Sequence, residues 1–207
     1  MPYSTTVAVP QKRTPTGAAV LRPGVTEAIS EAVLDELAET GYGKLSMEAV
    51  ARRAGVGKSA LYRRWPSKQE MVMKVLGELS VERAVAPDTG TLRGDLLGVL
   101  RALHEWLTHP RFSRILPDLA AEGVRNPEVA EAVRTAIGEP RRAASATMLH
   151  RAIDRGELPA DTDLEMALDL IAAPMYWRLS VRRAPAEPGY LDHLADVVQR
   201  ALKGGPS

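Results

Sequence analysis

The sequence contains no cysteine, which excludes disulfide bonds, zinc–thiolate sites and cysteine nucleophiles. It also lacks any apolar stretch close to the ~20 residues that a membrane-spanning helix needs. The longest apolar candidate, 170–177, is short and contains Pro174, and residues 1–23 have no apolar segment of the kind found in secretory signals. These absences predict a protein of the cytoplasm with no membrane partner.

Motifs of catalysis and metal binding are missing as well. The sequence has neither a Gly-x-Ser-x-Gly elbow nor a His-Glu-x-x-His motif. His104 and His109 are five positions apart and do not share a helical face well enough to bind one metal ion. Segment 55–59, Gly-Val-Gly-Lys-Ser, resembles the end of a phosphate-binding loop, but arginine stands where that loop needs its first glycine, and no strand precedes it. We therefore expect no catalytic residue, no metal ion and no cofactor.

The net charge of the whole chain is only +1, so it does not point to a partner. The charge is unevenly spread, however. Segment 46–68 holds six basic residues against one acidic residue, Glu48, which gives it a local net charge of +5 and leaves −4 for the remainder. Clustered cations are what phosphate binding requires, although charge alone fits a solvated helical face equally well.

Apolar residues recur at helical spacing along the chain, and no segment alternates as a strand would. This pattern predicts an all-α protein of about nine helices. Gly41 is expected to end the first helix, and Gly138-Glu139-Pro140 to kink or break the seventh. The expected helices span 24–41, 47–54, 58–65, 68–83, 91–109, 111–122, 127–156, 163–183 and 190–202.

The turn-rich segment 86–90, Ala-Pro-Asp-Thr-Gly, is the best candidate for a domain boundary. It divides the chain into a disordered tail over 1–22, a domain over 23–84 that includes the fourth helix, and a larger domain over 85–207. Lys12, Arg13 and Arg22 could let the tail touch DNA as a flexible arm, although such tails more often have no structural role.

Segment 46–68 has the layout of a helix-turn-helix, in which two short helices are joined by a tight turn and the second enters the major groove. Leu61 would be the buried residue of the second helix. Ser59 and Ala60 are small enough to let that helix approach base edges, and Tyr62 can hydrogen-bond a phosphate. Lys68 would add positive charge at the start of the next helix.

The residues of this region resemble the DNA-binding domain of the TetR family over about 55 positions, from 23 to 79. The resemblance lies in Gly41-Tyr42, Leu45-Ser46-Met47-Glu48-Ala49-Val50-Ala51, Ala54-Gly55-Val56 and Leu61-Tyr62-Arg63-Arg64-Trp65-Pro66-Ser67-Lys68. It implies a homodimer, a three-helix DNA-binding unit and a larger, variable domain that binds an inducer. One departure is Gly57, where the family usually has a serine or threonine cap.

The resemblance also implies roles for single residues. Ser46, Tyr62 and Lys68 would contact phosphate, while Lys58 and its neighbours would face bases. Together with the basic cluster, the candidate DNA contacts are Ser46, Arg52, Lys58, Ser59, Ala60, Tyr62, Arg63, Arg64 and Lys68.

The larger domain offers weaker signals for a ligand pocket. Large, adaptable side chains, Trp106 and Met166 among them, are scattered over several helices, and a kink at Pro174 would open space beside one of them. Plain core packing explains each position singly. The candidate ligand contacts are Leu100, His104, Phe112, Met148, Met175, Tyr176 and Trp177.

The last two helices have wide apolar stripes that would suit a four-helix contact across a two-fold axis, with internal packing as the alternative. The candidate interface residues are Leu164, Leu168, Ile171, Leu179, Leu191, Leu194, Val198 and Leu202.

The sequence thus predicts a dimeric DNA-binding regulator with a near-palindromic operator. The resemblance implies a repressor that an unidentified apolar or amphipathic small molecule releases from this operator, with activation as the alternative. Two copies of the helix over 58–65 would enter successive major grooves, roughly 34–36 Å apart. The alternatives are a helical enzyme or carrier and a helical adaptor that binds protein. The sequence names neither the ligand nor the operator.

Overall fold

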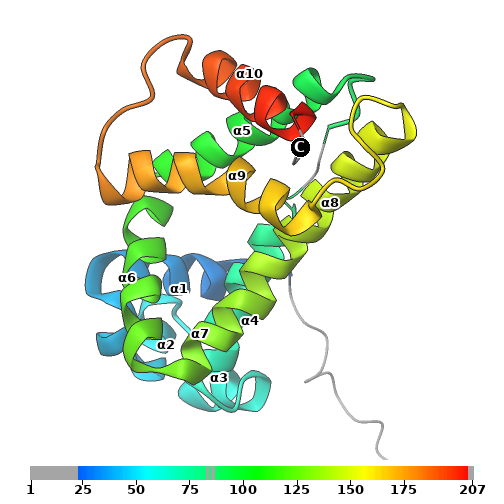
Figure 1. Ribbon diagram of the computed structural model, residues 1–207. Helices are drawn as coiled ribbons and strands as arrows, with labels where there is room; N and C mark the ends of the chain where they lie inside the picture. Colours follow the sequence, from blue (N-terminus) through cyan, green and yellow to red (C-terminus); the bar gives the residue numbers. More distant parts are fainter. Residues whose placement is uncertain (1–22, 83, 85–86, 205–207) are drawn as a thin grey trace, which may run out of the picture.

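The computed structural model describes residues 23–82, 84 and 87–204, and these residues contain helices but no strands (Figure 1). The predicted all-α class is confirmed. The tail, with Lys12, Arg13 and Arg22, lies outside the described residues. The helical segments are α1 (Pro23–Lys44), α2 (Met47–Arg53), α3 (Lys58–Arg64), α4 (Lys68–Glu82), α5 (Leu92–Thr108), α6 (Phe112–Arg125), α7 (Pro127–Val133), the π-helical η1 (Arg134–Gly138), α8 (Glu139–Asp154), α9 (Leu164–Tyr176), the π-helical η2 (Trp177–Val181) and α10 (Tyr190–Lys203).

Side-chain caps explain where several of these helices begin. Ser46, Thr91, Asn126 and Asp163 each accept a hydrogen bond from a backbone N–H of the first turn that follows. Such caps satisfy donors that have no partner inside the helix. Pro127 directly follows its cap, at a position where the missing N–H costs nothing.

Both predicted helix interruptions are present. The regular part of α1 ends at Gly41, which leaves the helical conformation (φ 77°, ψ 166°) and kinks the segment before a further turn reaches Lys44. The α-helical pattern is also interrupted just before residue 139. The π-helical η1 joins α7 to α8 there, and its wider turn accommodates Pro140 near the start of α8. With α7, η1 and α8 counted as one helix and α9 with η2 as another, the described residues form nine helices.

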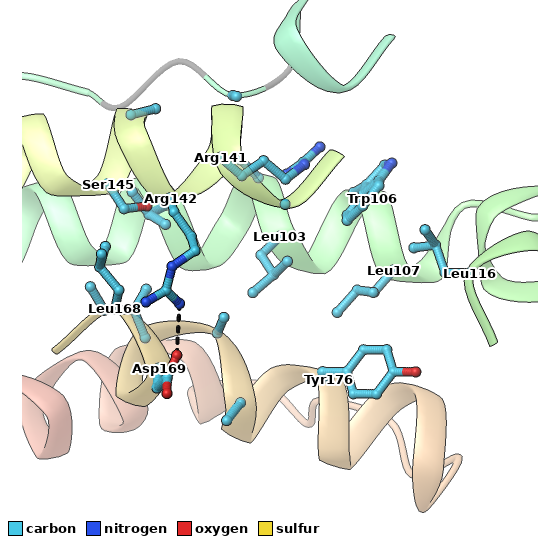
Figure 2. A pocket seen from close by; sticks show the side chains of 18 of the residues that line it. Leu103, Trp106, Leu107, Leu116, Arg141, Arg142, Ser145, Leu168, Asp169 and Tyr176 are labelled. Atoms are coloured by element: carbon cyan, nitrogen blue, oxygen red, sulfur yellow. Dashed lines mark hydrogen bonds and ion pairs between the residues drawn. The ribbon is translucent and has the colours of Figure 1, made fainter. Parts of the chain in front are cut away.

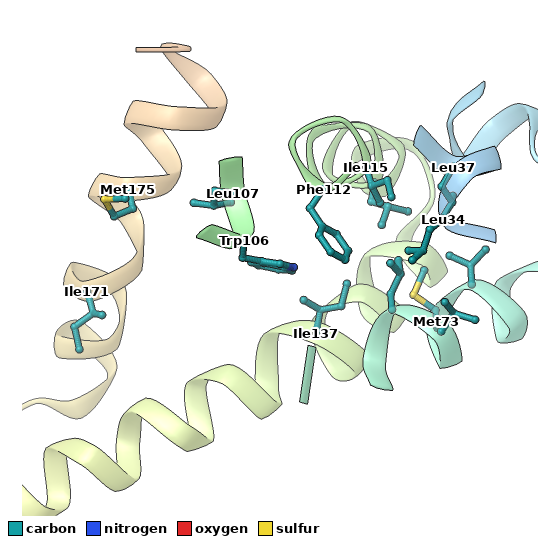
Figure 3. Close-up of a cluster of buried hydrophobic side chains, with 14 of the residues drawn as sticks. Leu34, Leu37, Met73, Trp106, Leu107, Phe112, Ile115, Ile137, Ile171 and Met175 are labelled. Atoms are coloured by element: carbon teal, nitrogen blue, oxygen red, sulfur yellow. The ribbon is translucent and has the colours of Figure 1, made fainter. Parts of the chain in front are cut away.

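A single cluster of buried side chains connects the first four helices with the rest of the chain. Figure 3 shows it between Leu37 of α1, Met73 of α4, Ile115 of α6 and Ile137 of η1, with Trp106 of α5 beyond them. The helices of the predicted DNA-binding domain therefore share a core with α6 and η1. The domain boundary near residue 85 falls between α4 and α5 and stays a prediction.

Candidate nucleic-acid interface and ligand cavity

The turn between α2 and α3 has the geometry that a helix-turn-helix requires. The Ser46 Oγ accepts a hydrogen bond from the Ala49 N–H at 3.1 Å and so starts α2. Gly55 has a positive φ of 67°, which favours glycine, and reverses the chain after α2. Gly57 stands at the N-cap of α3 without a side-chain bond, so the serine or threonine oxygen that the family usually has there is missing.

α3 is held by Leu61, whose side chain is fully buried, and exposes four residues on its other side. Lys58, Ser59, Tyr62 and Arg63 are exposed. Their spacing of i, i+1, i+4 and i+5 places them on one face of the helix. We call these four residues the α3 face. Arg52 is exposed on α2, and Ala60 is half-buried beside the α3 face.

Two of the predicted DNA contacts also hold the protein together. The Arg64 guanidinium donates to Thr26 Oγ1 of α1 at 2.9 Å and lies 5.1 Å from the centre of the Trp65 ring. The Lys68 ammonium donates to the carbonyl of Tyr42 at 2.8 Å and lies 4.4 Å from the centre of its ring. Both side chains are half-buried, and their contact with DNA stays a prediction.

The acidic residue of the basic segment was not among the predicted contacts, but it touches two of them. A Glu48 carboxylate oxygen lies 3.0 Å from the Lys58 ammonium, and the Tyr62 hydroxyl approaches the same oxygen at 3.5 Å. The hydrogen bond with Lys58 holds the pKa of Glu48 below its usual value. The sequence signal for this contact was available, because Glu48 is the one acid among six bases.

α1 carries acidic side chains that fix α2 and α6 in place. Arg53 of α2 donates to Glu36 at 2.8 Å and is also paired with Glu39. Arg111, at the start of α6, contacts Glu31 at 2.7 Å and Asp35 at 2.8 Å. The hydrogen bond with Glu39 raises the pKa of Arg53, and the one with Glu31 raises the pKa of Arg111. Ion pairs therefore connect α1 both to α2, which precedes α3, and to α6 of the larger domain.

Gly41 forms a second junction between the same two parts. The Asp118 carboxylate of α6 accepts a hydrogen bond from the Tyr42 N–H at 2.7 Å. A Cβ atom on Gly41 would lie 2.7 Å from an oxygen of that carboxylate, which is too close. Glycine is needed at position 41 for this approach as well as for its positive φ.

A cavity of about 590 Å³ lies between α5, α6, α8 and α9. Figure 2 shows Arg142 reaching from α8 toward Asp169 of α9 across it, with Tyr176 farther along α9. Its wall is mostly apolar and includes many small residues. The lining residues are Ala84, Val99, Ala102, Leu103, Trp106, Leu107, Leu116, Leu119, Ala120, Val133, Gly138, Arg141, Arg142, Ala144, Ser145, Leu168, Asp169, Ile171, Ala172, Ala173 and Tyr176.

Of the seven predicted ligand contacts, Tyr176 alone lines this cavity. Trp177 is 58% exposed, and His104 is half-buried outside the lining. The other four are buried core residues, namely Leu100, Phe112, Met148 and Met175. The sequence reasoning selected large side chains, which fill space, whereas alanines and a glycine leave much of the room in this cavity.

Arg141 connects the cavity with α4. Its guanidinium carbon lies 3.6 Å from the centre of the Trp106 ring, and its Nε donates to the Ser80 Oγ at 3.0 Å. Ser80 is buried in α4 and donates in turn to the carbonyl of Ile137 in η1 at 3.3 Å. Gly77, one turn earlier, allows α4 and η1 to approach closely, because a Cβ there would lie 3.3 Å from the Ala136 carbonyl oxygen.

The eight predicted interface residues face the interior of the chain itself. Leu164, Leu179 and Leu191 are half-buried against the core, and the remaining five are buried, namely Leu168, Ile171, Leu194, Val198 and Leu202. This placement matches the alternative of internal packing. The exposed large apolar side chains on the same elements are Met166 and Tyr176 of α9, Trp177 and Val181 of η2, and Val197 of α10.

Two features are absent from the described residues. No helix within the described ranges is long and apolar enough to cross a membrane. Across the same part of the chain, no three histidine, aspartate or glutamate side chains gather as metal ligands would.

Two parts of the chain match known family descriptions. "Bacterial regulatory proteins, tetR family" matches residues 29–75, and "Tetracyclin repressor-like, C-terminal domain" matches residues 86–198. The second match spans more than half of the chain.

Individual proteins are similar over nearly their whole length. The HTH-type transcriptional regulator YdeS of Bacillus subtilis is 30% identical over 181 residues, which are 87% of this chain and 89% of YdeS. The DNA-binding transcriptional repressor TetR of Mycobacteroides abscessus is 30% identical and covers 84% of this chain, with 92% of that protein matched. The crystal structure of the TetR family transcription regulator SCO0332 superposes with a TM-score of 0.69 at 30% identity, over 85% of this chain and 97% of that one. These proteins are regulators rather than enzymes, and the chain belongs to the TetR family of DNA-binding transcription regulators.

Proposed function

We propose that the protein is a repressor that binds a near-palindromic operator as a homodimer and leaves it when a small molecule enters the cavity. The observation that carries this proposal is the α3 face, where Lys58, Ser59, Tyr62 and Arg63 are exposed while Leu61 anchors the helix from behind. Cationic and hydroxyl groups on one exposed helix face are suited to phosphates and base edges. A regulator of this kind acts in the cytoplasm, where it meets the chromosome.

The contacts that we assign to DNA follow from exposure. Lys58, Ser59 and Arg63 face the bases of the major groove, while Arg52 and Tyr62 contact the flanking phosphates. Ser46 keeps a hydroxyl hydrogen available for phosphate, because its oxygen accepts the bond from Ala49. Arg64 and Lys68 contribute charge, although internal hydrogen bonds occupy part of each side chain.

The dimer that we propose uses the exposed surface of α9, η2 and α10. Met166, Trp177, Val181 and Val197 are each at least 40% exposed, so a partner can reach these apolar side chains. The Arg178 Nε donates to the carbonyl of Pro185 at 2.7 Å, so η2 is fixed to the loop that leads into α10. The same patch on two copies would meet across a two-fold axis.

The bond between Arg141 and Ser80 offers a route from the cavity to DNA. A ligand that contacts the Arg141 guanidinium would weaken its hydrogen bond to Ser80 of α4. Only a short connection separates α4 from α3. A shift of α4 changes the separation of the two α3 helices in the dimer. A ligand that binds the two arrangements with different affinity must alter DNA affinity in return.

The substitution Arg63→Ala tests the proposal, with the DNA that flanks the protein's own gene as the probe. We expect it to cost about 1–3 kcal/mol of binding free energy, measured by fluorescence anisotropy. The matched control is Arg134→Ala, which removes an exposed arginine from η1. Equal affinity in the two variants would reject α3 as the recognition helix. A wild-type protein with no preference for that DNA over a scrambled duplex would favour the adaptor alternative.

A further inference from the structure

The charged groups of the cavity lie on α8 and α9, and they are unequal in number. Arg141 and Arg142 contribute two guanidinium groups to the lining, whereas Asp169 contributes one carboxylate. Figure 2 shows the Arg141 guanidinium beside Trp106, whereas Arg142 reaches toward Asp169. We call Arg142 and Asp169 the charged end of the cavity. Arginine keeps its charge inside proteins, so the lining as a whole offers two cations and one carboxylate to whatever enters.

The remaining wall is suited to an apolar body. Figure 2 shows Leu107 and Leu116 on the opposite side of the view from Arg142 and Asp169. Leu103 of α5 lies between them, and Trp106 of α5 lies on the side of Leu107 and Leu116. The cavity volume of about 590 Å³ falls within the ~300–1,000 Å³ that small-molecule sites occupy. An apolar wall with a cation at one end matches a molecule that is apolar along its body and anionic at its head.

We propose that the cavity binds an amphipathic carboxylate whose head group pairs with Arg142 in exchange for Asp169. The proposal rests on the ligand-binding role proposed above, because it concerns the same cavity. It adds the chemical class of the ligand and the residues that select it.

Replacing the present partners of Arg142 costs little free energy, because those partners are exposed. The Arg142 guanidinium donates to Asp169 at 2.7 Å and is also paired with Glu165. The side chains of Asp169 and Glu165 are 68% and 83% exposed, so water solvates each carboxylate well once it is released. Exposed pairs of this kind contribute little to stability, and a ligand carboxylate can form the same two-pronged bond with the guanidinium.

Arg141 is the better oriented of the two arginines. Its guanidinium is stacked on the Trp106 ring and bonded to Ser80, which fixes its plane in the cavity wall. A ligand with a cationic head would be repelled by Arg142 and would gain nothing from this second cation in the wall, and the one carboxylate of the lining is already bonded to Arg142. A neutral head would gain no ion pair with Arg142. The charged end therefore discriminates by the sign of the head group.

The experiment compares three probes that each carry a ten-carbon chain: decanoate and decyltrimethylammonium below their micellar concentrations, and decanol below its solubility limit. Their apolar bodies are alike, so isothermal titration calorimetry of the full chain isolates the effect of the head group. We expect decanoate to bind at least about tenfold more tightly than decanol, and the cation to bind most weakly. Decanol or the cation binding as tightly as decanoate would overturn the carboxylate proposal and leave a ligand cavity in place. Failure of all three probes to bind would overturn both.

Two substitutions locate the head group. Arg142→Met is expected to remove most of the advantage of decanoate over decanol without weakening decanol, while Asp169→Asn is expected to strengthen decanoate several-fold because the competing carboxylate is gone. The control Arg134→Met removes an exposed arginine outside the lining and should leave the ratio unchanged. An unchanged decanoate-to-decanol ratio in Arg142→Met would overturn the assignment, even if decanoate binds well.

Discussion

Glu48 is the residue that competes most directly with DNA for the α3 face. Its carboxylate holds the Lys58 ammonium at 3.0 Å and lies 3.5 Å from the Tyr62 hydroxyl, so two groups proposed to contact DNA are engaged by an acid in the free protein. The Lys58 hydrogen bond lowers the pKa of Glu48, which keeps the carboxylate charged at neutral pH. DNA must displace this charge or bind beside it.

The substitution Glu48→Gln is therefore expected to tighten DNA binding, by several-fold at low salt. It removes a negative charge near the phosphates and frees Lys58. The gain should shrink as salt rises, because the screening length falls from ~30 Å at 0.01 M to ~10 Å at 0.1 M. Fluorescence anisotropy with flanking and scrambled DNA across a salt series measures both effects. Glu105→Gln, an exposed glutamate of α5, is the control. Weaker binding by Glu48→Gln would mean that the carboxylate positions Lys58 for DNA instead.

Sequence reasoning located the basic segment but not the direction in which each cation points. Lys58 and Arg64 look equivalent in the sequence, yet one is exposed and the other donates to Thr26, which lies 38 positions earlier. Lys68 likewise meets the Tyr42 carbonyl 26 positions away. Local spacing predicts the face of a helix. The approach of α1, which is a long-range contact, decides which cations remain exposed to solvent.

At the scale of helices, α4 lies between the α3 face and the cavity. The Ser80 hydroxyl accepts a hydrogen bond from the Arg141 Nε at 3.0 Å and donates one to the Ile137 carbonyl. This one hydroxyl therefore connects α4, η1 and α8. Sequence patterns predicted α4 itself and an interruption near residue 138. They did not predict that the interruption is a π-helical turn packed against Gly77, because its position depends on contacts between distant segments.

We expect Ser80→Ala to uncouple the two sites while leaving each competent. In this variant, DNA affinity without ligand and decanoate affinity without DNA should stay within about threefold of the original, but decanoate should shift DNA affinity less. Coupling is reciprocal, so DNA should also shift decanoate affinity less. Anisotropy measures the first effect and calorimetry the second.

The control for this prediction is Ser113→Ala, which removes an exposed hydroxyl at the start of α6. Ser80→Ala removes two hydrogen bonds at a buried site, at a cost of about 0.5–1.5 kcal/mol each. Urea unfolding of both variants shows whether the chain tolerates that cost. A ligand effect on DNA that is undiminished in folded Ser80→Ala would contradict the proposed route.

At the scale of the whole molecule, the position of the apolar side chains decides how two copies can meet. The sequence showed that α9 and α10 carry wide apolar stripes, and the stripes are real, but Leu168, Leu194 and Val198 turn toward the core of the same chain. Periodicity identifies the most apolar side of a helix, and in a single chain that side is the buried one. A partner would meet what is left outside, which includes Trp177 and Val197.

The burial of these side chains determines which substitution can test the dimer. A charge at Leu194 would disrupt the core of each protomer and would not report on the interface alone. Trp177→Asp instead alters a side chain that is 58% exposed in the single chain. We expect it to raise the dimer dissociation constant by at least about tenfold in sedimentation velocity, because large aromatic side chains contribute most to interfaces. DNA affinity should fall with it, since one protomer holds only one α3.

The control substitution is Val124→Asp, which places the same charge on an apolar side chain of α6 that is 85% exposed. It matches Trp177→Asp in chemistry but lies outside the proposed patch, so its dimer should persist. Helical circular dichroism of both variants separates a lost interface from a lost fold. If Trp177→Asp sediments as a dimer while remaining folded, the surface of α9, η2 and α10 is not where two copies meet, and the spacing of the two α3 helices must be set by another face.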